Sequence, residues 1–132
     1  MILLEELQKV ENFAKENKLK KIISSPVKYK NILFSRHLFK SKIGVLKLTK
    51  TFWGDSIRVV LPASTDIYLS GGKTHSSELR LTKYLINNIQ ETDTVLDIGA
   101  HVGYFTLLIS TLAKKAKCMR LKHLQKHLIC SN

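Results

Sequence analysis

The stretch from Thr94 to Thr106 constrains the fold more than any other part of the chain. A short apolar run ends at Asp97, and a turn that contains Gly99 and Gly103 leads into a helical pattern of apolar residues. This order predicts a strand, a tight turn and the start of a helix, as in an open α/β sheet. In such sheets ligands bind at the carboxyl ends of the strands, where glycine lets the backbone approach them closely.

The letters from Asp97 to Thr106 read D-I-G-A-x-x-G-x-x-T. They resemble motif I of class I S-adenosylmethionine-dependent methyltransferases, in the form typical of the FkbM family of O-methyltransferases. The phosphate-binding P-loop motif fits less well, because no Lys-Ser/Thr pair follows Gly103. The dinucleotide-binding motif G-x-G-x-x-G also fits less well, because its three glycines are absent. A strand–turn–helix without a ligand is the remaining alternative. The resemblance extends over about residues 43–113.

The resemblance implies a site for S-adenosyl-L-methionine at this turn. Asp97 would attract the amino group of the cofactor, and the backbone at the two glycines would approach its methionine and ribose portions. His101 would donate a hydrogen bond to the ligand or merely fill the turn, and no residue is assigned as the catalytic base. The expected cofactor-binding residues are Asp97, Gly99, Ala100, His101, Gly103 and Glu78.

Glu78 enters this set because a glutamate recurs at this place ahead of motif I in FkbM-type sequences. It falls at the start of a helix that the apolar pattern predicts from Ser77 to Gln90. The alternative role for Glu78 is to compensate the positive end of that helix.

The segments before the motif predict helices followed by short antiparallel strands. Apolar residues recur at helical spacing over residues 1–17, which favours a helix docked on a core or a partner over one lying on a membrane surface. From Ile43 the period changes to two, which predicts strands from Ile43 to Leu48, from Ile57 to Leu61 and from Asp66 to Leu69.

The resulting fold class is α/β: an incomplete Rossmann-like class I methyltransferase sheet, preceded by N-terminal helices and short antiparallel strands. Four regions follow from this pattern. They are a basic helical region (1–42), the antiparallel strands (43–72), the start of the methyltransferase domain (73–117) and the tail (118–132).

The tail does not continue the family pattern. A complete site of this family needs an acidic residue at the end of the next strand for the ribose hydroxyls, yet no Asp or Glu follows Asp97. Codons read from the third base of Lys117 can spell V-Y-A-F-E-A-S-P-K-T-F. This reading resembles the second-strand segment of FkbM-type sequences, and its Glu falls near position 122. The sequence therefore predicts a frameshift near Lys114 and Lys115 and an out-of-frame tail. The chain would be an N-terminal fragment with weak or no cofactor binding and no turnover.

A zinc site is the alternative for the tail, because it holds two cysteines and two histidines. The residues concerned are Cys118, His123, His127 and Cys130. Their spacing matches no common zinc module, so the sequence predicts no metal.

Charge suggests a second class of function. The formal net charge is +12, and residues 1–54 hold twelve Lys/Arg against four acids. A basic module that binds nucleic acid or an anionic surface is therefore the alternative to catalysis. Nucleic acid is not expected as a partner, because no RNA-binding signature with interleaved aromatic residues occurs.

The family resemblance implies O-methylation of a hydroxyl on a sugar or a secondary metabolite, with a small molecule or saccharide as the acceptor. The sequence does not indicate the oligomeric state. Glu5 and Glu6 follow a short apolar start, the two cysteines make no disulfide framework, and no apolar run has membrane-spanning length. These features predict a cytoplasmic protein without a transmembrane segment.

Overall fold

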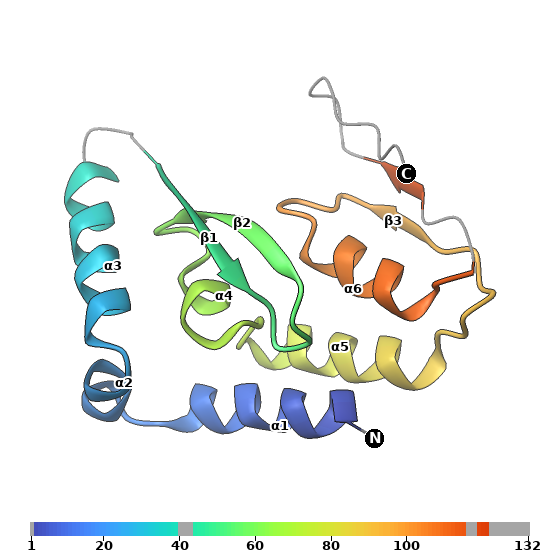
Figure 1. Cartoon of the computed structure of the whole chain (residues 1–132), viewed down its shortest axis with the longest axis horizontal. Coiled ribbons are helices and arrows are strands. Elements are labelled where there is room, and N and C mark those ends of the chain that lie inside the picture. The colour runs from blue at the N-terminus through green and yellow to red at the C-terminus, as the bar shows by residue number, and fades with distance from the viewer. Residues whose placement is uncertain (1, 40–43, 116–118, 122–132) are drawn as a thin grey trace. The chain divides into compact units, whose positions relative to one another are not determined.

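A computed structural model describes residues 2–39, 44–115 and 119–121 (Figure 1). The chain divides into two units, Met1–Ile86 and Asn87–Asn132, each with its own packing. The described residues form six helices and two sheets of two strands each. The α/β class is thus confirmed, whereas a Rossmann-like sheet stays a prediction. None of the helices in the described ranges combines the length and the apolar character that crossing a bilayer requires.

Helix α1 (Ile2–Lys15) begins the first unit and buries one apolar face. Leu7 and Val10 have exposed fractions of 1% and 2%, and they form a core cluster with Leu79. Two partly buried side chains pack against this cluster, Phe52 and Ile86. The prediction that the first helix docks on a core is therefore confirmed.

Two further helices, α2 (Lys18–Ser24) and α3 (Pro26–Phe39), complete the basic N-terminal region. Proline suits the first position of α3, because its missing N–H has no acceptor there in any helix. Lys28 joins α3 to the next helical segment by donating to the carbonyl oxygen of Leu69 at 3.2 Å. Burial lowers the pKa of Lys28 below its ordinary value.

Strands β1 (Val45–Lys50) and β2 (Ser56–Leu61) pair in antiparallel fashion. Val45 lies opposite Leu61, and Lys50 lies opposite Ser56. Alternate residues of β2 are buried, as a half-buried strand requires: Ile57, Val59 and Leu61. This pair matches the first two predicted strands, although Ile43 lies outside the described residues.

The third predicted strand, from Asp66 to Leu69, is wrong, because these residues belong to helix α4 (Thr65–Ser70). Ile67 and Tyr68 are consecutive and both buried, which a helix allows but a half-buried strand does not. Local polar contacts favour the helix: the Asp66 carboxylate accepts from the N–H of Ile67 at 2.9 Å. Gly71 ends the helix with φ 74°, and its N–H donates to the Ile67 carbonyl at 2.9 Å.

Helix α5 (Ser76–Asn88) lies within two residues of its predicted bounds at either end. The carbonyl of His75 accepts from the N–H of Leu79 at 2.9 Å, so the helical hydrogen bonds begin at His75. Glu78 stands in the first turn, as predicted. The buried residues of α5 are Leu79 and Thr82.

The second unit contains strand β3 (Leu96–Ile98), helix α6 (Tyr104–Leu112) and strand β4 (Met119–Leu121). The two strands pair in parallel, with Leu96 opposite Met119 and Ile98 opposite Leu121. Parallel strands joined through a helix form a β-α-β unit, which is the building unit of open α/β sheets. Tyr104, Leu108 and Ile109 are the buried residues of α6.

Candidate functional site

The predicted strand–turn–helix is present in the second unit. Asp97 is the middle residue of β3 and is half-buried, while its neighbours Leu96 and Ile98 are exposed at 49% and 75%. Successive side chains of a strand point to opposite faces. The Asp97 carboxylate therefore lies on the opposite face of β3 from these two apolar side chains.

The turn after β3 has an unusual backbone. Three of its residues have positive φ: Gly99 at 82°, His101 at 43° and Gly103 at 84°. The N–H of Gly103 donates to the carbonyl of Ala100 at 2.6 Å and closes the turn. The left-handed conformation costs a side-chain-bearing residue such as His101 roughly 1 kcal/mol, so the turn holds it against a local preference.

The Asp97 carboxylate is held by α6. Thr106, in the first turn of that helix, donates its hydroxyl to Oδ2 of Asp97 at 2.5 Å. Among the residues that the structure describes, none donates a hydrogen bond to Oδ1 of Asp97. One oxygen of the Asp97 carboxylate thus accepts from α6, and the half-buried side chain is partly open to solvent.

The start of α6 offers a second polar element. The first helical hydrogen bond of α6 runs from the N–H of Leu107 to the carbonyl of Gly103, at 2.9 Å. The amino-terminal end of a helix carries partial positive charge, so the turn after β3 leads to the positive end of α6.

Space is available at the start of the turn. A Cβ atom built on Gly99 would meet no atom of the described residues within 4 Å. A ligand can therefore reach the backbone at this position without displacing a side chain. The turn thus brings together five of the six predicted site residues, namely Asp97, Gly99, Ala100, His101 and Gly103.

Glu78 belongs to the first unit, where it has a structural contact. Its carboxylate lies 3.3 Å from Nζ of Lys73, which also lies 3.9 Å from the carboxylate of Asp66. Lys73 is mostly buried, at 19% side-chain exposure, so the ion pair ties the start of α5 to α4. The ion pair with Lys73 is a structural role for Glu78 that the sequence did not indicate, and its proposed cofactor contact stays a prediction.

Two residues with roles at these places escaped the sequence analysis. Thr106 is the last letter of the motif, but its contact with Asp97 spans nine residues and depends on how the turn closes. Lys73 follows two glycines and gave no periodic signal. The fixed spacing of Asp97 and Thr106 in the family motif was the available clue to the first.

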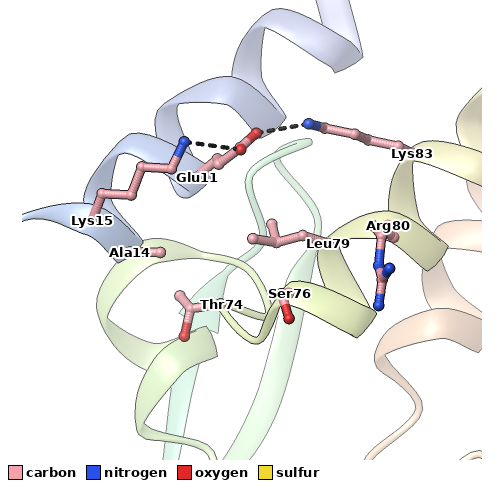
Figure 2. Close-up of a pocket in the computed structure, with 8 residues that line it drawn as sticks. All are labelled: Glu11, Ala14, Lys15, Thr74, Ser76, Leu79, Arg80 and Lys83. Carbon is pink, nitrogen blue, oxygen red and sulfur yellow. Dashed lines mark hydrogen bonds and ion pairs between the residues drawn. The ribbon is translucent and has the colours of Figure 1, made fainter.

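A separate pocket of about 540 Å³ lies in the first unit between α1 and the start of α5 (Figure 2). Its lining residues are Glu11, Ala14, Lys15, Thr74, Ser76, Leu79, Arg80 and Lys83. Glu11 holds both lysines, with Lys83 Nζ at 2.7 Å and Lys15 Nζ at 3.1 Å (Figure 2). The two lysines are thereby neutralised in part, and none of the predicted site residues lines the pocket.

The pKa of Glu11 lies below its ordinary value, chiefly because of the hydrogen bond from Lys83 and then that from Lys15. A lowered folded-state pKa gives stability that is present above the ordinary pKa and is lost as pH falls through the lowered one. We expect the thermal midpoint of the wild-type chain to fall more than that of Glu11→Gln between about pH 5 and about pH 3. Circular dichroism melts across this range measure the difference.

Glu5→Gln is the control for this experiment, because Glu5 is an exposed carboxylate of the same helix. Its melts should follow those of the wild-type chain at every pH. Parallel pH profiles for wild type and Glu11→Gln would show that the ion pairs of Glu11 add nothing to stability.

The zinc alternative cannot be placed on the structure, because Cys118, His123, His127 and Cys130 lie outside the described residues. Among the residues described, no group of three or more His, Cys, Asp or Glu side chains is arranged to hold a metal ion. Position 122, where the alternative reading frame places its glutamate, is also outside the described part.

Comparisons with protein-family models, with curated protein sequences and with solved structures find no match to this chain.

Proposed function

We propose that the chain carries the cofactor-binding turn of an S-adenosyl-L-methionine-dependent methyltransferase of the FkbM type, a family whose resemblance implies O-methylation of a hydroxyl of a sugar or secondary metabolite. The observation that carries the proposal is the contact between Thr106 and Asp97 at the carboxyl end of β3. It gives a physical role to the first and last letters of the motif D-I-G-A-x-x-G-x-x-T.

The residues of the turn fit the methionine portion of the cofactor. Oδ1 of Asp97 would accept from its positively charged amino group, and the positive end of the α6 dipole would favour its carboxylate. The open space at Gly99 would admit the ligand beside the backbone. When bound, the cofactor supplies an activated methyl group on a sulfonium, and the protein needs mainly to hold and orient the reactants.

Recognition of the ribose is the weak part of this site. Carboxylates accept hydrogen bonds from ribose hydroxyls in dinucleotide folds, and no Asp or Glu follows Asp97 in this chain. We therefore propose that the chain binds the cofactor weakly, through the methionine end, and shows no turnover.

An NMR titration of the ¹⁵N-labelled chain with S-adenosylhomocysteine or S-adenosylmethionine tests the proposal. We expect shifts of the amide signals of Gly99, His101 and Gly103 and a dissociation constant on the order of 1 mM. Asp97→Asn removes the charge that binds the amino group, and we expect it to weaken binding by about ten-fold, which is the loss of one charge-assisted hydrogen bond.

Asp93→Asn is the matched control, because it makes the same change in the same unit at a carboxylate that accepts from the N–H of Gln90 at 2.8 Å. This variant should bind like the wild-type chain. Unchanged turn signals at 10 mM ligand, or equal binding by Asp97→Asn and wild type, would contradict the assignment. Low-micromolar affinity would contradict the claim that ribose recognition is weak.

A further inference from the structure

The second and third helices lie in a segment of uniformly positive charge. Residues 17–39 contain six Lys/Arg and no Asp or Glu. Such a segment repels cations and attracts an anionic partner. The charge alone does not distinguish between partners, but the apolar side chains among these charges do.

Helix α2 buries none of its residues. Leu19 and Ile23 are exposed at 75% and 80%, and Ile22 is exposed at 42%. Three large aliphatic side chains on one helix of seven residues gain little from folding if they stay in water. Together they form an exposed apolar group on α2.

Helix α3 has two unlike faces. Its inner face carries the buried residues Ile32 and Ser35, and Asn31 donates to the hydroxyl of Tyr68 at 2.9 Å. Together with the contact from Lys28 to α4, these bonds fix which side of α3 faces the protein. The other side carries three exposed apolar residues, Val27 at 72%, Leu33 at 65% and Phe34 at 59%.

Exposed basic side chains occur on the same two helices: Lys18, Lys20, Lys30 and Arg36. Lys20 is paired with Glu16 at 3.1 Å, and Lys21 is held by the Ala14 carbonyl at 3.0 Å. We call this the α2–α3 surface. It consists of Leu19, Ile22, Ile23, Val27, Leu33 and Phe34 with the basic residues Lys18, Lys20, Lys30 and Arg36.

We propose that the α2–α3 surface binds an anionic phospholipid membrane. Lysine and arginine beside exposed Leu, Ile, Val and Phe match the two layers of a bilayer surface, namely anionic headgroups and the acyl chains beneath them. Nucleic acid fits less well, because aliphatic side chains find no partner on phosphates and sugars. The proposal does not rest on the cofactor site.

Membrane affinity should depend on both the apolar and the basic residues of the α2–α3 surface, because neither kind of residue alone gives stable membrane binding. We expect the full chain to bind vesicles of phosphatidylcholine with 30% phosphatidylglycerol and to bind pure phosphatidylcholine vesicles at least about ten-fold more weakly. Binding to the anionic vesicles should fall as salt rises from about 0.05 M to about 0.5 M.

Cosedimentation of the full chain with vesicles gives the partition coefficient of each variant. The double variant L19S/I23S removes two exposed aliphatic side chains, and we expect its partition coefficient to fall at least about ten-fold. Lys18→Gln and Lys30→Gln should each lower it by about five-fold, the effect of one basic residue near an anionic surface.

Leu48→Ser is the matched control, because Leu48 is exposed at 66% but lies on β1, outside the α2–α3 surface. This variant should bind like the wild-type chain. Ile23→Trp adds a readout that does not depend on loss of binding. Its emission should shift to shorter wavelength with the anionic vesicles and stay unchanged with pure phosphatidylcholine.

Three results would overturn the proposal. They are no binding to anionic vesicles, equal binding to both kinds of vesicle, and equal binding by wild type and L19S/I23S. Salt-dependent binding to RNA that L19S/I23S leaves unchanged, in a chain that ignores vesicles, would assign the basic residues to nucleic acid instead. A negative cofactor titration leaves all these readouts unaffected, because they involve only the first unit.

Discussion

Substitution of Gly71 by alanine is expected to lower the free energy of unfolding by about 3 kcal/mol, the sum of backbone strain and overpacking. Gly71 has φ 74°, and a Cβ atom there would lie 2.8 Å from the N atom of Phe52 and 3.0 Å from the carbonyl oxygen of Lys50. Backbone atoms cannot rotate away as a side chain can. The Gly71 carbonyl also accepts from the N–H of Phe52 at 2.9 Å, so any shift weakens this bond.

Gly54→Ala separates the two causes, because Gly54 also has positive φ, 101°, but a Cβ there would meet nothing within 4 Å among the described residues. We expect this control to cost only about 1 kcal/mol, from backbone strain alone. Urea unfolding followed by far-UV circular dichroism measures both values. Equal losses for the two variants would mean that the approach of Phe52 to Gly71 is not rigid.

Leu7→Ala is expected to cost about 3 kcal/mol, because it leaves a cavity in the cluster that joins α1 to α5. Leu7 is exposed by only 1% and lies against Val10 and Leu79 in this cluster. The surrounding side chains come from two helices and cannot all move into the space. The same urea experiment, with the amide exchange rates of α1 as a second readout, measures the loss.

Ile2→Ala provides the comparison, because Ile2 is on the same helix and is exposed at 76%. Its effect should stay within about 0.5 kcal/mol, as for most surface substitutions. If Leu7→Ala has an equally small effect, α1 does not dock on α5 in solution, and the core of the first unit must be assigned differently.

The sequence predicted those elements in which apolar residues recur regularly along the segment, or in which glycines mark a turn. α1 and α5 have apolar residues at helical spacing, and β2 alternates, so each was placed within a few residues. The turn after β3 was also expected, because two glycines follow an acidic residue there. These are local signals, and the local structure followed them.

The failures have a common physical cause in polar contacts and caps that hydropathy does not record. The segment from Asp66 to Leu69 was predicted as a strand, but the buried pair Ile67 and Tyr68 and the cap at Gly71 favour a helix. The ion pair of Lys73 with Glu78 likewise depends on how α4 leads into α5. Hydropathy periods carry no information about such contacts.

The bond between Thr106 and Asp97 has a consequence for the entropy of ligand binding. A carboxylate that is already confined to one rotamer loses little conformational freedom when a ligand arrives, whereas ordering a mobile side chain costs about 0.5–1.5 kcal/mol. That confinement exists only while the first turn of α6 is helical, because Thr106 belongs to that turn. Fraying of the helix would therefore release Asp97, so that under the proposed function cofactor affinity and the local stability of α6 would rise and fall together.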